Sequence, residues 1–264
     1  MMDLPRSFHS LPQESQTLLR ELGLTEMEQV FTDPRIETWR SIPERENCTL
    51  DAMLADGRTI RLHIKRHKAA RNAKPPGEQE ADGISILEQA KIPTMKLIAW
   101  GKMEDGRSFL ITEDLAEHRP ADKLIESGVP FERLLEPTAD LAAKLHSAGL
   151  HHRDLYLCHF LAKLDDKTLD LRLIDAARVA QLPAWFFRQR WIVKDLAQFW
   201  YSATRLSVST EQLEKWLQRY AQQRSLETID TLRRAIERKV RWITRHDAKL
   251  NERQPQRNLS LPGT

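Results

Sequence analysis

The residues best suited to chemistry in this chain lie at positions 151–160, His-His-Arg-Asp-Leu-Tyr-Leu-Cys-His-Phe. Asp154 can accept the proton of an attacking hydroxyl group, and His159, five residues later, can reach a metal ion or a phosphate. A second carboxylate, Asp175, ends a short alternating apolar run at residues 171–175. This pattern suits a strand whose terminal carboxylate holds Mg²⁺. Phosphoryl transfer needs this combination, because cations must neutralise the γ-phosphoryl group while a carboxylate orients the acceptor.

The elements that position these residues follow from periodic patterns. Apolar residues at three- and four-residue spacing from Leu134 to Ala148 predict an amphipathic helix that ends at Gly149 and leads into the loop. Residues 36–65 predict a β-hairpin with its turn at Asp56-Gly57. Two further strands are predicted at 96–100 and 108–112, and a helix from Glu78 to about Ala90 follows the breaker Pro75-Pro76-Gly77.

Four stretches resemble the lipopolysaccharide core heptose kinases, a family with a protein-kinase-like fold. These stretches are Ile-Lys-Arg-His at 64–67, Ile-Pro-Thr-Met at 92–95, His-Arg-Asp-Leu-Tyr-Leu-Cys-His-Phe at 152–160 and Trp-Ile-Val-Lys-Asp-Leu-Ala-Gln-Phe-Trp-Tyr-Ser-Ala at 191–203. The resemblance implies an α+β, bilobal fold with a small β-rich N-lobe and a larger helical C-lobe. We therefore expect a helical extension over 1–30, the N-lobe over 31–115, and the C-lobe with a basic C-terminal helix over 116–264.

The resemblance also implies roles in binding ATP and Mg²⁺. Lys65, which the strand period sends to the face opposite Ile64, would hold the α- and β-phosphates, although a lone lysine at a strand end is usually a solvated charge. Glu80 would pair with Lys65, with Glu78 as the alternative. Glu113 and Leu115 would flank a hinge whose backbone binds adenine.

In the catalytic loop, the resemblance assigns Asp154 as the catalytic carboxylate and Arg153 as an ion-pairing residue that fixes the loop. Asp175 would hold Mg²⁺. His159 stands where protein kinases have a metal-binding asparagine, and it would contact either the metal or a phosphate; imidazole is a poor Mg²⁺ ligand. Asp195 is expected to begin a helix and to brace the loop.

Two departures from the kinase pattern leave a non-catalytic scaffold as an alternative. Residues 40–49, which would cover the phosphates, contain no glycine, so Arg40 or Arg45 would have to supply side-chain contacts. The sequence Asp175-Ala176-Ala177 replaces Asp-Phe-Gly, which weakens the case for a switchable activation segment.

The partners follow from charge and aromatic patterning. The net charge of +3 does not favour nucleic acid, but residues 65–74 and 231–253 are locally basic. Residues 185–194 mix aromatic and basic side chains, which suits a phosphorylated glycan, or else they simply pack within the C-lobe. The apolar stripe of Leu232, Ile236, Val240 and Ile243 fits contact with anionic lipid or burial in the C-lobe.

We therefore predict an ATP-dependent kinase that phosphorylates a sugar hydroxyl, a heptose, of the lipopolysaccharide inner core. The alternatives are a small-molecule or protein phosphotransferase of the same fold, or an inactive scaffold. The first residues, Met-Met-Asp-Leu-Pro-Arg, lack the apolar core of a signal peptide, which predicts a cytoplasmic protein, peripheral at the inner face of the membrane. The patterns leave the oligomeric state open.

Overall fold

The computed structural model describes residues 12–69, 74–165 and 168–253, so the start of the chain and four residues of the basic run 65–74 lie outside the described residues. The chain divides into two compact units. The first unit runs to Ile86 and includes Thr94–Ala116; the second comprises Leu87–Pro93 and the chain from Glu117 onward. The first is built on a β-sheet and the second mainly on helices, which confirms the predicted α+β class.

The first unit contains a five-stranded antiparallel sheet in the order β1-β2-β3-β5-β4. Its strands are β1 Ile36–Ile42, β2 Arg45–Met53, β3 Thr59–His67, β4 Leu97–Lys102 and β5 Ser108–Glu113. The predicted hairpin is confirmed, since β2 and β3 pair across a turn in which Gly57 has a φ of +83°. This left-handed conformation favours glycine at that position.

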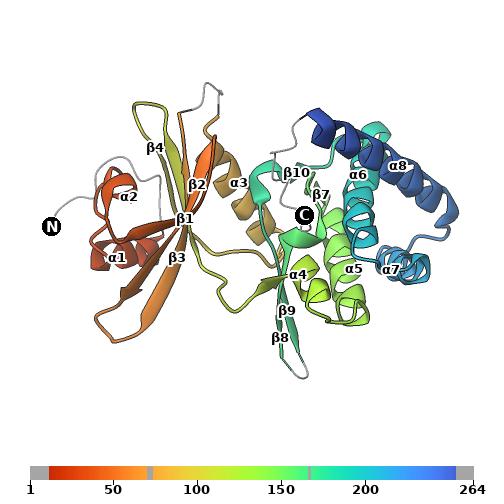
Figure 1. Ribbon diagram of the computed structural model, residues 1–264, viewed down its shortest axis with the longest axis horizontal. Helices are drawn as coiled ribbons and strands as arrows, with labels where there is room; N and C mark the ends of the chain where they lie inside the picture. Colours follow the sequence, from red (N-terminus) through yellow and green to blue (C-terminus); the bar gives the residue numbers. More distant parts are fainter. Residues whose placement is uncertain (1–11, 70–73, 166–167, 254–264) are drawn as a thin grey trace. The chain divides into compact units, whose positions relative to one another are not determined.

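Helices lie on both faces of this sheet (Figure 1), namely α1 Gln13–Glu21 and α2 Gln29–Thr32 on one face and α3 Pro76–Gln89 on the other. Leu19 and Leu24, from the segment expected to form an N-terminal extension, are fully buried in the same core as Leu50 and Leu62. Helix α3 approaches the sheet so closely that a Cβ atom at Gly77 would lie 2.5 Å from the carbonyl oxygen of Phe109. Only glycine fits that contact.

The second unit consists of helices and two small antiparallel sheets. The helices are α4 Ala121–Glu126, α5 Glu132–Ser147, α6 Trp185–Thr204, α7 Thr210–Gln223 and α8 Asp230–Arg253. One sheet contains β6 Arg119–Pro120, β8 Phe160–Leu164 and β9 Leu169–Leu173, and the other contains β7 Leu150–His151 and β10 Ala180–Gln181. Short 3₁₀ helices cover Leu157–His159 and Ala176–Arg178.

Aromatic side chains form the centre of the second unit. The Phe199 ring stacks on Trp216 with centroids 4.2 Å apart and meets Phe160 edge to face at 5.6 Å. Trp216 in turn stacks on Tyr220 at 5.9 Å, so α6, α7 and β8 share one core. Such ring pairs stabilise the fold by more than the burial of their apolar surface alone. Helix α6 also packs along α8, as Figure 1 shows in cyan and blue.

The structure decides how the apolar stripe of α8 is used. Leu232, Ile236 and Ile243 are buried, and α8 packs against α6, so the stripe belongs to the core of the second unit. The basic side chains remain on the outer side, where Arg234 and Arg241 are exposed. No helix in the described part of the chain has an apolar stretch long enough to cross a membrane.

Candidate active site

The loop between β7 and β8, which carries the predicted catalytic residues, is fastened to α6 by Asp195. One carboxylate oxygen of Asp195 accepts a hydrogen bond from the His152 amide at 2.7 Å and the other accepts one from the Arg153 amide at 2.8 Å. Burial opposes charge on Asp195, but the bond from His146 and the loop amide keep the pKa of this carboxyl below its usual value. Asp195 therefore braces the loop as a buried carboxylate.

The predicted position of Asp195 at a helix start is wrong. Helix α6 begins at Trp185, because the aromatic and basic residues 185–194 are themselves helical, and Asp195 lies in its interior. The carboxylate is thus held by hydrogen bonds across the core rather than by the dipole of a helix terminus.

Two further side chains on the same face of α6 extend this attachment. Gln198 Oε1 accepts a hydrogen bond from the Leu155 amide at 3.2 Å, and Ser202 Oγ accepts one from the Leu157 amide at 3.0 Å. Residues spaced by three and four positions share a helix face, so Asp195, Gln198 and Ser202 form one row. Gln198 and Ser202 were not predicted from the sequence; their signal is a row of polar residues within the buried, mostly apolar second half of the helix.

A left-handed backbone places Asp175 beside the loop. Strand β9 ends at Leu173, two residues earlier than expected, and Asp175 has φ 60° and ψ 57°. Its neighbour Ile174 is tied to the loop in both directions, since its amide donates to the His159 carbonyl at 3.0 Å and its carbonyl accepts from His152 Nε2 at 3.0 Å. A non-glycine residue in this conformation is strained by about 1–3 kcal/mol, a feature that clusters at functional sites.

Asp154 is held by Arg178, a cation that was not predicted from the sequence. Arg178 Nη1 lies 3.1 Å from each carboxylate oxygen of Asp154, and Gln198 Nε2 lies 3.4 Å from one of them. Arg178 ends the short 3₁₀ helix that follows Asp175. The turn after β9 thus supplies both a carboxylate and a guanidinium group to the loop.

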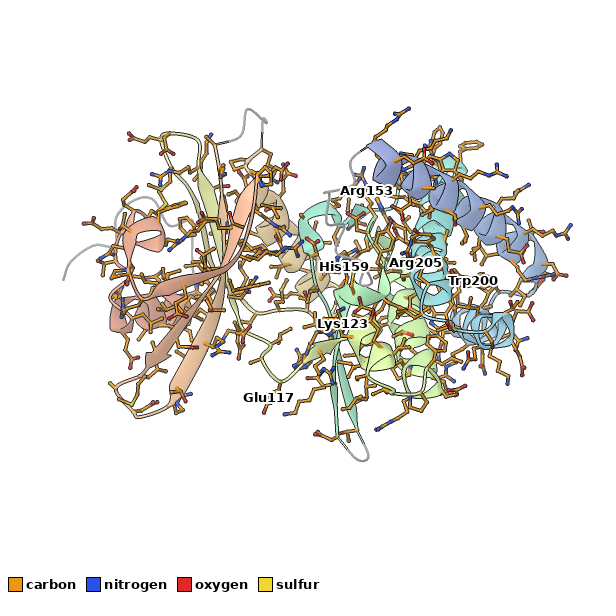
Figure 2. All side chains as sticks on the ribbon, viewed as in Figure 1. Glu117, Lys123, Arg153, His159, Trp200 and Arg205 are labelled. Carbon is orange, nitrogen blue, oxygen red and sulfur yellow. The ribbon has the colours of Figure 1, made fainter. Side chains whose placement is uncertain are left out.

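His159 lies between the backbone of Asp154 and the carboxylate of Asp175 (Figure 2 labels it on the loop before β8). Its Nδ1 donates to the carbonyl of Asp154 at 2.6 Å, and its Nε2 lies 3.5 Å from Asp175 Oδ2. Burial alone would favour the neutral ring, but contacts with Cys158, Asp175 and the Asp154 carbonyl raise the pKa of His159 to about 9. A ring protonated on both nitrogens has no lone pair for a metal ion.

Arg153 does not make the expected ion pair with any residue that the structure describes. Its guanidinium lies over the Trp191 ring, 4.7 Å from the centroid. Its buried Nε has no hydrogen-bond partner among the described residues. Its carbonyl accepts from Lys194 Nζ at 2.6 Å, and its φ is 72°. Loop position is therefore set through the Arg153 backbone, because the buried carboxylate Asp195 bonds its amide and not its side chain.

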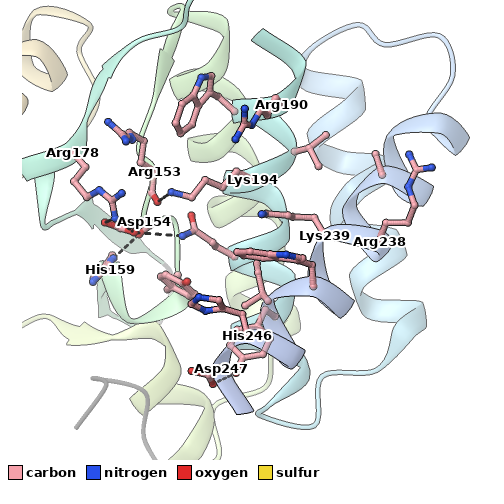
Figure 3. A pocket seen from close by; sticks show the side chains of 18 of the residues that line it. Arg153, Asp154, His159, Arg178, Arg190, Lys194, Arg238, Lys239, His246 and Asp247 are labelled. Carbon is pink, nitrogen blue, oxygen red and sulfur yellow. Dashed lines mark hydrogen bonds and ion pairs between the residues drawn. The ribbon is translucent and has the colours of Figure 1, made fainter. Parts of the chain in front are cut away.

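These residues face a pocket of about 1040 Å³ within the second unit (Figure 3). Asp154, His159, Asp175 and Arg178 line it from the loop and the turn after β9. Its remaining walls come from α6 and α8 and are rich in cations and rings, namely Arg190, Trp191, Lys194, Arg238, Lys239 and Trp242. The predicted catalytic carboxylate therefore opens onto a cavity large enough for a substrate.

In the first unit, Lys65 pairs with Glu80. Their Nζ and Oε1 atoms are 2.6 Å apart, and both side chains are buried. Of the two glutamates considered, Glu78 instead faces Lys74, 3.9 Å away. A buried pair of this kind fixes the direction of the lysine, because moving either charge would leave the other uncompensated.

The predicted hinge begins at the last residue of β5. Glu113 is exposed at the end of the strand, and Leu115 is partly buried two residues later. The amide of Glu113 donates to the Lys96 carbonyl at 3.0 Å, and the amide of Asp114 donates to the Arg61 carbonyl at 3.1 Å. Neither amide is available to an adenine ring in this conformation.

We expect Lys65→Met to weaken ATP binding about 10- to 100-fold, the loss of one charge-assisted contact. Calorimetric titration with ATP and Mg²⁺ measures this directly. Lys68→Met, an exposed lysine just beyond the same strand, is the matched control and should bind ATP as the unaltered chain does. Equal affinity in the Lys65 variant would remove Lys65 from the nucleotide site.

Of the side chains at the site, only those with carboxylate oxygens suit Mg²⁺ as ligands. Among the described residues, no three His, Cys, Asp or Glu side chains form a ready-made metal cluster. Mg²⁺ is usually held by one or two carboxylates together with substrate phosphates and water, so the partly exposed carboxylate of Asp175 suits it.

Comparison with known proteins now decides the family. The model of the lipopolysaccharide kinase (Kdo/WaaP) family matches residues 25–220, which include Lys65, the catalytic loop and Asp195. The chain belongs to this family. Two similar members are the lipopolysaccharide core heptose(I) kinases WaaP of Pseudomonas aeruginosa and Escherichia coli K12. The first is 30% identical over 196 residues, 66% of this chain and 69% of that protein. The second is 31% identical over 181 residues, 62% of this chain and 67% of that protein.

Membership in the Kdo/WaaP family confirms the resemblance and two of its implications. The fold is the kinase-like α+β fold, with a β-rich first unit and a helical second unit. The chain is a kinase, a phosphotransferase with an alcohol group as acceptor. The roles of the individual site residues remain predictions.

Proposed function

We propose that this chain transfers the γ-phosphoryl group of ATP, in the presence of Mg²⁺, to a heptose hydroxyl of the lipopolysaccharide inner core. The observation that carries the proposal is Asp154 on a braced loop at the edge of a pocket of about 1040 Å³. The names of the relatives support heptose as the acceptor.

Each residue then has one task. Asp154 accepts the proton of the attacking hydroxyl group, which requires Arg178 to leave its carboxylate or to share it with the acceptor. Asp175 supplies a carboxylate for Mg²⁺, and bound Mg²⁺ would neutralise charge on the phosphates. We leave His159 outside the metal ligands, because both of its nitrogens are engaged; as an imidazolium it is a hydrogen-bond donor. Lys65 binds nucleotide phosphate with Glu80 behind it.

The decisive experiment is incubation of the purified chain with ATP, Mg²⁺ and core oligosaccharides truncated at successive sugars. Mass spectrometry should locate one added phosphate on a heptose and none on oligosaccharides that lack it. An aminoglycoside and a serine-containing peptide serve as acceptors for the two other phosphotransferase readings. Phosphate found only on one of those would refute the proposal.

For Asp175 we expect Asp175→Asn to reduce the Mg²⁺-dependent part of ATP binding at least about tenfold, because the metal loses a charged ligand. Calorimetric titration with and without Mg²⁺ separates this part from the rest. Asp165→Asn, an exposed aspartate in the connection between β8 and β9, is the control. Unchanged Mg²⁺ dependence in the Asp175 variant would contradict the assignment.

We further propose peripheral contact with anionic membrane through the outer face of α8, where Arg234, Arg241 and Arg245 are exposed. Its apolar stripe is buried, so the contact would be electrostatic and would weaken with salt. Sedimentation with anionic and neutral vesicles should show binding only to the former, reduced about fivefold for each arginine changed to glutamine. Binding that ignores these changes would exclude this face.

A further inference from the structure

The pocket beside Asp154 contains a group of cations that surrounds Trp191. The Arg153 guanidinium lies 4.7 Å from the centroid of this ring, Lys194 Nζ lies 5.7 Å from it and the Arg190 guanidinium 5.9 Å. From α8, Lys239 extends over Trp242, with Nζ 3.6 Å from that ring. Figure 3 shows Lys194 and Lys239 entering the pocket from different helices.

Within the described part of the chain, these cations form no ion pair with an acid, whereas the acids of the pocket are paired with cations. Among the described residues, no ion pair involves Arg153, Arg190, Lys194 or Lys239, and we call these four residues the cation group. The pocket acids are each matched with a cation, as the pairs Asp154 with Arg178, Asp175 with His159 and Asp247 with Arg205 illustrate. The pocket therefore carries uncompensated positive charge.

Burial adds to this electrostatic cost. It lowers the pKa of Lys194, as does the neighbouring Arg178, against the opposing charges of Asp154 and Asp195. It also lowers the pKa of Lys239, as does Arg190. Like charges brought together and partly removed from water are unfavourable in the empty pocket. An anion bound among them would relieve that repulsion, and each contact would be a charge-assisted hydrogen bond.

We propose that the cation group is an anion-binding subsite that recognises a carboxylate or phosphate on the acceptor. The substrate would then be an acidic oligosaccharide, whose charged unit binds among these cations while a neighbouring sugar presents its hydroxyl to Asp154. This inference rests on the proposed function. A volume of about 1040 Å³ slightly exceeds the range of about 300–1,000 Å³ for small-molecule sites, which suits several sugar units.

Position within the pocket supports the same assignment. Lys194 is bonded to the carbonyl of Arg153, the residue directly before Asp154, so an anion at Lys194 lies next to the catalytic loop. Binding energy from the charged unit would thus orient the acceptor hydroxyl rather than only hold the molecule.

The test compares one core oligosaccharide with the same oligosaccharide after its carboxyl groups are reduced to alcohols and its phosphates are removed. For the unaltered chain, the KM for the neutralised acceptor should be about 10- to 100-fold higher, the loss of one charge-assisted contact. Lys239→Gln should raise the KM for the acidic acceptor and abolish most of this preference, and Lys239→Arg should restore it. Lys249→Gln removes an exposed lysine from the same helix outside the pocket and should change nothing.

Calorimetric binding of both oligosaccharides without ATP makes the test independent of turnover. Tighter binding of the acidic form that depends on Lys239 supports the subsite, even if no phosphate is transferred, in which case the proposed function alone fails. If both forms are phosphorylated and bind equally well, the subsite is refuted and the kinase assignment stands. Failure of both forms to bind also refutes the subsite.

Discussion

Asp154→Asn is expected to lower kcat for the sugar acceptor by about 10²- to 10⁴-fold, the usual contribution of a positioned general base. The amide keeps the shape of the side chain and a hydrogen-bond acceptor for Arg178, but it cannot take the acceptor proton. Because Asp154 has no assigned contact with nucleotide, the affinity for ATP should stay unchanged. Steady-state kinetics together with ATP titration measure both quantities.

A matched aspartate on a neighbouring strand controls for loss of charge alone. Asp170 on β9 is exposed and pairs with Arg172 at the surface, so Asp170→Asn should leave kcat unaltered. If the Asp154 variant retained the turnover of the unaltered chain, the proton acceptor would have to be another residue, and the catalytic-loop assignment would fail.

Asp195→Ala should lower the free energy of unfolding by about 3–5 kcal/mol. The substitution leaves the amides of His152 and Arg153 without their buried acceptor, and each unsatisfied buried group costs about 1–3 kcal/mol. For a chain of this size the melting temperature should fall by roughly 10 °C. Thermal and urea unfolding followed by circular dichroism measure the change.

The pH dependence of stability checks that the effect comes from the charged carboxylate. The native pKa of Asp195 is lowered from its ordinary value of 3.8, despite its burial, by His146, His152 and the loop amide. Its stabilisation is therefore complete above about pH 4 and decreases as the pH falls toward the native pKa. The difference in stability between the unaltered chain and the Ala variant should shrink in that range; a difference that stayed constant would point to packing instead.

Local patterns were sufficient for much of the fold and for the carboxylates. The alternation around Asp56-Gly57 predicted the β2–β3 hairpin because a period of two directly encodes which face is buried. Asp154, His159 and Asp175 were recognised from residue types and short spacings, and the structure brings all three to one pocket.

Residues that act through contacts between distant segments were missed or misjudged. Arg178, Gln198 and Ser202 look ordinary in sequence, and only the packing of the loop on α6 and on the turn after β9 gives them partners. Arg153 was expected in an ion pair, but the ring of Trp191, a helical turn before Asp195, covers its guanidinium instead. Tertiary contacts of this kind have no local pattern.

The row of Asp195, Gln198 and Ser202 has a consequence for how the enzyme moves. Since four amides of the catalytic loop are bonded to one face of α6, their hydrogens can exchange with solvent only when the loop separates from that helix. The loop then opens away from the helix as one cooperative segment, on the slow timescale of subglobal unfolding. Rearrangement during each turnover is left to side chains such as Arg178, which can rotate within nanoseconds while the backbone beneath stays still.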